Sequence, residues 1–198
     1  LNLSKKKLLE KNFTIFNDNY ALCIFHPVVE EFDSIKKNFK IFHKSLKKSV
    51  KKRVWISPNS DAGSSIIKEE FDKMRDVSDI YFENLPRFEY LNLLKNCEFI
   101  IGNSSSGIIE SATFNKACIN IGRRQNKRLC INNVIHVKKI TERNILNAIE
   151  KVKTKNFINN LKKVKNPYGD GKASEKIINI LLNNKTKYNN LLKKTLTF

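Results

Sequence analysis

A chain of 198 residues, of which 40% are hydrophobic, is long enough to bury a core, and its length suggests one domain with room for an appendage. Its 38 lysine and arginine residues outnumber 19 acidic residues, and the formal net charge of +19 raises the question of nucleic-acid binding. The basic residues are spread singly along amphipathic stretches without interleaved aromatics, which disfavours a specific nucleic-acid site and leaves only non-specific attraction of polyanions.

The cysteines and the hydropathy of the sequence indicate the cellular compartment in which the chain is expected. The four cysteines, Cys23, Cys97, Cys118 and Cys130, have no CxxC spacing, and three lie in or beside apolar runs. We therefore expect buried free thiols in a reducing cytosol, rather than disulfides or a metal site. No apolar run approaches the roughly 20 residues that cross a bilayer. The expected protein is cytoplasmic, with no membrane partner, metal or cofactor, and because Leu1 is not methionine we expect further sequence upstream.

Short β-branched runs alternate with amphipathic stretches along the chain, which is typical of repeated βα units. Residues 1–18 are predicted to form a connector helix from a missing N-terminal domain. The strands and helices that follow are expected, in chain order, at Tyr20–Phe25 (strand), Val29–Ser49 (helix), Arg53–Ile56 (strand), Ser64–Arg75 (helix), Asp79–Phe82 (strand), Arg87–Cys97 (helix), Glu98–Ile101 (strand), Ser105–Phe114 (helix), Ala117–Ile121 (strand), Asn133–Val137 (strand) and Thr141–Val152 (helix). Six strands with their crossovers predict an α/β fold, a doubly wound, parallel, six-stranded Rossmann-like sheet over residues 19–165. Residues 166–198 are predicted to form helices that pack toward the missing domain.

A glycine- and serine-rich turn, Gly102-Asn103-Ser104-Ser105-Ser106-Gly107, follows an apolar strand and opens a predicted helix. Free N–H groups and the helix dipole at such a turn favour an anion, and small residues let phosphate oxygens approach the backbone. Glu110 falls one to two turns into that helix, where its carboxylate can accept hydrogen bonds from a ribose diol. Taken alone, the turn is equally compatible with simple N-capping by its serines and with a solvated Glu110.

Polar turns also follow three other predicted strands. His26 ends the first strand, where an imidazole can donate to a phosphate, act as an acid or base, or simply cap the sheet. Asn59 and Asp61 follow the second strand as ligand groups or Asx-turn residues. Arg124 follows the fifth, in a basic loop that is either solvated or a clamp for a diphosphate. Ligands of open α/β sheets bind beyond the carboxyl ends of the strands, so the convergence of four polar turns on one rim indicates a phosphate-ligand site.

In this order, the motifs resemble the C-terminal domain of the UDP-N-acetylglucosamine 2-epimerases, particularly the hydrolysing branch that feeds sialic-acid-type sugar synthesis. The matching residues are His26-Pro27-Val28, Pro58-Asn59, Asp61-Ala62-Gly63, Ile101 to Ser105 with Gly107 and Glu110, Ile119 to Gly122 with Arg124, Gln125 and Arg128, Asn133-Val134, and Tyr168 to Gly171. The resemblance implies the C-terminal half of a glycosyltransferase-B-like enzyme, in which two Rossmann-type domains face each other across a cleft. We also expect a homo-oligomer in the full-length form.

The resemblance implies a binding site for a UDP-sugar substrate. Ser104 and Ser105 would bind the diphosphate, and Arg124 would neutralise it. Glu110 would take the ribose hydroxyls, and the backbone near Leu85 would meet the base. The complete implied set is His26, Asn59, Leu85, Ser104, Ser105, Glu110 and Arg124.

His26 and Asn59 would reach the nucleotide in such a site, and His26 is the catalytic candidate that this chain carries. The hydrolysing reaction of the family converts UDP-N-acetylglucosamine and water to N-acetylmannosamine and UDP. It removes the proton at sugar C2, eliminates UDP and then adds water. Most of the acid/base carboxylates belong to the family's N-terminal domain, so this chain alone is expected to bind nucleotide without turnover. Arg123 and Lys127 depart from the family's pattern, which implies a reshaped loop or a more anionic substrate.

Four alternatives to this function remain open from the sequence. A related enzyme acting on a diacetamido sugar nucleotide would share every motif. The non-hydrolysing 2-epimerases more often have Asp-Ser-Gly-Gly in the phosphate turn, which disfavours them here. A glycosyltransferase of the same fold would keep the diphosphate site but need an acceptor, and a non-catalytic binding domain would keep the site without the reaction.

Overall fold

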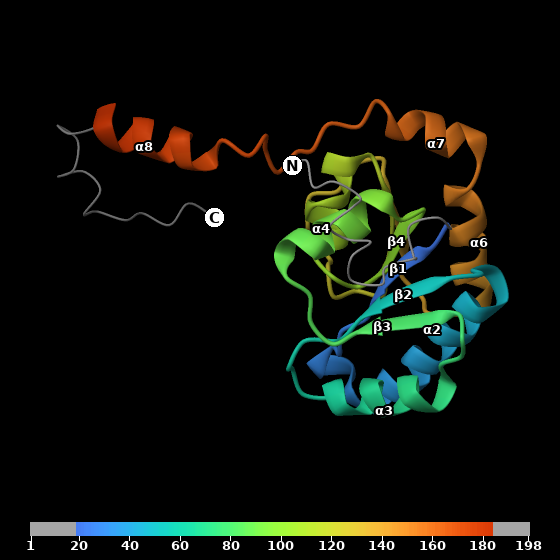
Figure 1. Cartoon of the computed structure of the whole chain (residues 1–198). Helices are drawn as coiled ribbons and strands as arrows, with labels where there is room; N and C mark the ends of the chain where they lie inside the picture. The colour runs from blue at the N-terminus through green and yellow to red at the C-terminus, as the bar shows by residue number, and fades with distance from the viewer. Residues whose placement is uncertain (1–18, 184–198) are drawn as a thin grey trace. The chain divides into compact units, whose positions relative to one another are not determined.

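The computed structural model describes residues 19–183 and divides the chain into two compact units, one ending at Lys165 and the other beginning at Asn166 (Figure 1). The connector helix expected over residues 1–18 lies outside the described residues. Within the described part of the chain, no helix is both long and apolar enough to cross a membrane.

The first unit is built around one six-stranded parallel sheet with the order β3-β2-β1-β4-β5-β6. The strands are β1 (Ala21–Ile24), β2 (Arg53–Ile56), β3 (Asp79–Phe82), β4 (Phe99–Gly102), β5 (Ala117–Ile121) and β6 (Val134–Val137). The chain builds outward from β1 in one direction and then, from β4, in the other. This confirms the expected doubly wound sheet, and it places the reversal of strand order between β1 and β4, where ligands of such sheets bind.

Helices cover both faces of the sheet (Figure 1). They are η2 (Val29–Ser34, a 3-10 helix), α2 (Ile35–Ser49), α3 (Ser64–Met74), α4 (Arg87–Asn96), α5 (Ser106–Ile109), η3 (Ser111–Phe114, also 3-10), α6 (Glu142–Val152) and α7 (Lys155–Leu161). Apolar side chains of α2, α3 and α6 form the core on one face, and those of α4 and α5 form the core on the other. Alternate residues of β1 serve the two cores, Cys23 the first and Leu22 the second, as the two-residue period of a strand requires.

Two expected helices are broken in the structure. The stretch expected as one helix from Val29 begins as a 3-10 turn with a kink at Glu31 and becomes α-helical only at Ile35. The helix expected over Ser105–Phe114 lasts four residues as α5 before η3 replaces it. The Ser111 hydroxyl donates to the Gly107 carbonyl, so it takes the acceptor that the next helical turn would use.

Gly102 closes β4 in a conformation that only glycine tolerates. Its φ is +141°, and a Cβ there would lie 1.7 Å from the Ile24 carbonyl oxygen. The close approach lets the Asn103 N–H donate to that oxygen at 3.0 Å. Beyond it, the Asn103 side chain accepts from the His26 N–H at 2.6 Å and donates to the His26 carbonyl at 2.8 Å. The loops after β1 and β4 are thereby fixed to each other.

The amino edge of the sheet, opposite the carboxyl ends of the strands, holds a buried ion pair. Arg53, the first residue of β2, donates from Nε to Asp79 Oδ1 at 2.6 Å, and Trp55 Nε1 donates to the same oxygen at 2.8 Å. The His43 ring lies 3.5 Å from the other carboxylate oxygen. Burial alone would raise the pKa of Asp79, but the nearby His43 ring and the hydrogen bonds from Arg53, Trp55 and the Asp76 N–H hold it well below its usual range. The pair therefore stays ionised and joins β2, β3 and α2.

The second unit contains α8 (Ala173–Asn183) among its described residues. Ile177, Ile178 and Leu182 of this helix are each more than half exposed.

Candidate functional site

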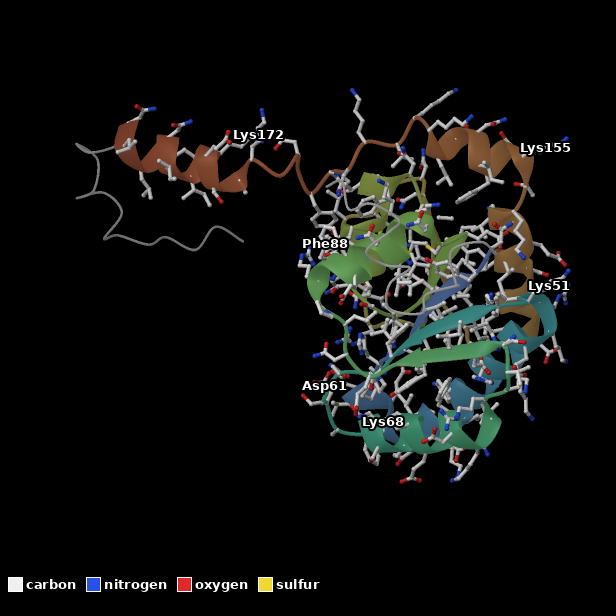
Figure 2. The ribbon with its side chains drawn as sticks, in the orientation of Figure 1. Lys51, Asp61, Lys68, Phe88, Lys155 and Lys172 are labelled. Atoms are coloured by element: carbon white, nitrogen blue, oxygen red, sulfur yellow. The ribbon has the colours of Figure 1, made fainter. Side chains whose placement is uncertain are left out.

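Polar side chains gather at the carboxyl edge of the sheet, where the loops after β1, β2, β4 and β5 meet. Figure 2 shows Asp61, from the loop after β2, at this edge and Lys51, which precedes β2, at the opposite one. The sequence predicted this convergence from four separate turns. The structure links three of these loops through Asn103, which bonds His26 on one side and residues of the β5 loop on the other.

The turn after β4 presents unused backbone donors. The N–H groups of Ser104, Ser105 and Ser106 have no acceptor among residues 19–183, whereas Gly107 and Ile108 already donate to the carbonyls of Ser104 and Ser105. Consecutive free N–H groups form a concave anion site. The four-residue helix α5 is shorter than expected and supplies little dipole, so the free amides, the serine hydroxyls and the nearby Arg124 are the main groups that could attract an anion.

Two side chains from the β5 loop anchor on the carbonyl of Asn103. Arg124 Nη1 donates to it at 3.3 Å and Gln125 Nε2 at 2.9 Å. Arg128 Nε in turn donates to Gln125 Oε1 at 2.5 Å. The Arg124 guanidinium also lies 3.8 Å from an Asp61 carboxylate oxygen and is about a quarter exposed. Arg124 is therefore held beside the serine turn with part of its donor set still accessible.

A cavity of about 650 Å³ opens beside these groups. Its lining is Pro27, Val28, Val29, Glu30, Asp61, Ser105, Arg123, Arg124, Gln125 and Arg128. This volume lies in the range of small-molecule sites. Arg123 is engaged with Glu31 at 2.6 Å, so Arg124 and the serine turn are the better placed groups for an anion. A second cavity of about 530 Å³ lies along His26, Asn59 and Lys68.

The His26 ring is neutral and has a defined tautomer. Its Nδ1 accepts the Asn59 N–H at 3.0 Å, so the ring proton sits on Nε2. Burial and the nearby Arg124 guanidinium lower the pKa of His26 to about 4, against an opposing contribution from Asp61. At neutral pH this imidazole offers one N–H donor and no free basic nitrogen.

Glu110 and Leu85 form a second group, on the α4 side of the serine turn. Glu110 Oε1 pairs with Arg87 Nη1 at 2.8 Å, while its Oε2 is buried without a hydrogen-bond partner in the described part of the chain. Leu85 lies in the loop just before α4, two residues from Arg87, and packs partly on the α4-side core. The serine turn is thus joined to Arg124 through Asn103 on one side and to α4 through the bond between Tyr90 and Ser106 on the other.

Several groups at the site escaped the sequence reasoning. Gln125 and Asn103 were visible within motifs but had no assigned role, and only their tertiary bonds reveal one. Arg87 pairs with Glu110 across 23 positions of sequence. Tyr90 donates to Ser106 Oγ at 2.6 Å, and nothing in its helical surroundings signals that contact. Among the described residues there is no cluster of three or more histidine, cysteine or acidic side chains that could hold a metal.

Comparisons with known proteins identify the family of the chain. A sequence profile of the family described as UDP-N-acetylglucosamine 2-epimerase matches residues 1–182. A Legionella pneumophila protein described as UDP-N,N'-diacetylbacillosamine 2-epimerase (hydrolyzing) is 38% identical over 176 residues, which cover 84% of this chain and 45% of that protein. A Neisseria meningitidis UDP-N-acetylglucosamine 2-epimerase is 36% identical over 133 residues, 67% of this chain and 35% of its own length.

A solved structure shares the fold. The N. meningitidis UDP-N-acetylglucosamine 2-epimerase bound to UDP-N-acetylglucosamine superposes with a TM-score of 0.70 at 18% identity, covering 90% of this chain and 49% of the other. The chain spans about half the length of the relatives it matches or less. On its profile match and its 38% identity to the Legionella protein, the chain belongs to the UDP-N-acetylglucosamine 2-epimerase family.

Proposed function

We propose that this chain is the nucleotide-binding half of a hydrolysing 2-epimerase that converts UDP-N-acetylglucosamine and water to N-acetylmannosamine and UDP. The observation that carries the proposal is the serine turn, whose three N–H donors have no acceptor among residues 19–183 and lie beside Arg124 at the switch point of the sheet. A diphosphate needs several donors and one or more cations, and both kinds of group meet there.

The two groups of residues at the site divide the ligand between them. Ser104 and Ser105 bind the diphosphate, and Arg124 neutralises its charge. Glu110 Oε2 accepts a ribose hydroxyl, which would satisfy a buried carboxylate oxygen that has no partner within residues 19–183. The backbone near Leu85, on the Glu110 side of the turn, meets the base.

His26 acts as a hydrogen-bond donor to the leaving diphosphate. The Asn59 N–H occupies Nδ1, so Nε2–H is the group available to the ligand. A pKa of about 4 means that the ring is not already protonated at neutral pH and cannot serve there as a full cation. Stabilising the leaving group lowers the barrier to eliminating UDP, but the base that removes the C2 proton has to come from elsewhere.

The remaining acid/base groups belong, in this proposal, to an N-terminal domain outside the chain. Residues 1–18 would connect to it and residues 166–198 would pack toward it, giving a two-domain enzyme of the glycosyltransferase-B kind. The chain's match to less than half of the Legionella protein supports this division. Alone, the chain binds UDP and does not turn over.

Calorimetric titration of UDP into the chain, at low and moderate salt, tests the site. The double variant Glu110→Gln with Arg124→Ala removes the two anchors at opposite ends of the ligand. Arg143→Ala with Glu150→Gln makes the same change of charge on α6 and is the matched control. Saturable binding that survives moderate salt, is lost in the first variant and is kept in the control supports the proposal. Binding that fades equally in all three proteins would mean that the +19 charge alone attracts UDP.

The reaction itself is tested in the full-length protein. Free N-acetylmannosamine and UDP should appear from UDP-N-acetylglucosamine without any acceptor. Dependence of UDP release on an added acceptor would instead make the protein a glycosyltransferase, and release of UDP-linked product would make it a non-hydrolysing epimerase.

A diacetamido sugar nucleotide is the second candidate substrate. The 38% identity to the Legionella hydrolysing diacetylbacillosamine epimerase favours it specifically. Comparing kcat/KM for the two nucleotide sugars in the same full-length protein decides between them.

A further inference from the structure

Three hydroxyl groups, those of Tyr90, Ser106 and Ser104, form a series of hydrogen bonds that leads from the core to the serine turn. Tyr90, on α4, packs its ring against the α4-side core, and its hydroxyl donates to Ser106 Oγ at 2.6 Å. Ser106 Oγ lies 3.1 Å from Ser104 Oγ. Tyr90 is thus connected to Ser104 through the Ser106 side chain, which has no ligand role in the function proposed above.

The hydrogen bond at the buried end of this series of hydroxyls has a defined direction, from Tyr90 to Ser106. Burial raises the pKa of Tyr90 well above its ordinary value, although its bond to Ser106 opposes the rise, so the phenol keeps its proton. A hydroxyl has one proton and two acceptor sites. Tyr90 donates to Ser106 Oγ, and the contact between Ser106 and Ser104 can be donated from either oxygen. In the arrangement in which Ser106 donates to Ser104, the Ser104 proton is left to point away from both residues, toward a ligand.

We propose that Tyr90 is a positioning residue that orients the hydroxyl protons of Ser106 and Ser104 toward the diphosphate, an inference that rests on the UDP-binding function proposed above. Serine hydroxyls in water rotate freely, and a ligand that needs their protons must first order them. A donor fixed in the core does that ordering before the ligand arrives, and aligned hydroxyls polarise one another.

An orienting role for Tyr90 can be distinguished from a packing role by the ligands whose binding it affects. Tyr90→Phe keeps the ring and its core contacts but removes the phenol proton that orients the hydroxyl groups of Ser106 and Ser104. The loss should therefore fall on ligands with phosphate and spare uridine, which has none. Ser106 lies between Tyr90 and Ser104, so removing the Ser106 hydroxyl should cut the connection and make Tyr90→Phe silent.

The experiment measures UDP and uridine binding by NMR titration of the full-length protein, in wild type, Tyr90→Phe, Ser106→Ala and the double variant. Tyr81→Phe, which removes a phenol hydroxyl from β3 on the other face of the sheet, is the control. Thermal unfolding of each variant reports whether it is folded.

We expect Tyr90→Phe to weaken UDP binding by about 2- to 10-fold, the range for one hydrogen bond, with uridine binding and Tm unchanged. In the Ser106→Ala background, Tyr90→Phe should have no further effect. Unchanged UDP affinity, an equal loss for UDP and uridine, or additive effects of the two substitutions would each overturn the role of Tyr90. If the wild-type protein binds no UDP, the proposed nucleotide site is itself refuted, and the role of Tyr90 is refuted with it.

Discussion

Replacing Gly102 by alanine should destabilise the first unit severely. A Cβ at this position would lie 1.7 Å from the Ile24 carbonyl oxygen and 2.6 Å from its carbon, both backbone atoms of the neighbouring strand. Contact without overlap needs about 3.4 Å, so β1 and β4 would have to separate by roughly 1.5 Å or more at their ligand end. That movement would also lengthen the 3.0 Å bond from Asn103 N–H to Ile24.

The expected loss combines this clash with the strain of a positive φ. A residue with a side chain at φ +141° costs about 1 to 3 kcal/mol before any contact is counted. Forced separation of central strands adds several more, so we expect a total above about 4 kcal/mol. Because a domain is stable by about 5 to 15 kcal/mol, the variant should be partly or wholly unfolded at 37 °C.

Urea unfolding measures this loss, with the single tryptophan, buried Trp55, as a fluorescence probe. Gly122→Ala is the matched control, because Gly122 also has a positive φ, +74°, but a Cβ there would meet only a side-chain carbon at 3.5 Å. Gly122→Ala should therefore show the strain without the clash, about 1 to 2 kcal/mol. Equal losses in the two variants would refute the steric argument for Gly102.

Three other predictions concern charge and protonation. Arg53→Met leaves the carboxylate of Asp79 buried and unpaired, so it should reduce the free energy of unfolding in urea by about 3 to 5 kcal/mol, whereas Arg75→Met, at an exposed pair, should change it by under about 1 kcal/mol. His26 has a folded pKa of about 4 against an ordinary 6.5, so the unfolded chain binds the extra proton first and stability should fall as pH drops from 6.5 to 4. His26→Gln should lose less over that window, and parallel curves would contradict the lowered pKa. Glu110→Gln should weaken the preference for UDP over its 2'-deoxy analogue in competitive binding, and an unchanged preference would separate Glu110 from the ribose.

The arrangement of the sheet could be predicted because its signal is local. The runs Arg53–Ile56, Asp79–Phe82 and Ala117–Ile121 have the bounds expected from their β-branched residues. The early end of α5 could not be predicted, because it depends on whether the Ser111 hydroxyl points to the carbonyl of Gly107 or to solvent. Helical periodicity records apolar spacing and carries no information about that choice.

Some residues of the candidate site could likewise be predicted from the sequence, and others could not. Ser104 and Ser105 could be proposed as phosphate ligands from the sequence, because a small-residue turn after a strand is a local pattern with a local consequence. Tyr90 was missed, because its hydroxyl meets Ser106 only when α4 is packed beside the turn. The neutral state of His26 was equally inaccessible, since it depends on Asn59 and Arg124, which are distant in sequence. The chemistry of a local turn can be inferred from the sequence, whereas contacts that depend on tertiary packing cannot.

Asn103 extends the hydrogen bonding between β1 and β4 beyond the ends of these strands. Its side-chain amide both accepts from and donates to the backbone of His26, as the peptide group of a paired strand would. The ladder between the two central strands is thus prolonged by one rung after the strands themselves have ended at Ile24 and Gly102. The floor on which a nucleotide would rest is therefore part of the rigid sheet. Within the described part of the chain, any movement that closes around a ligand would have to come from segments outside that ladder, such as η2 and the start of α4.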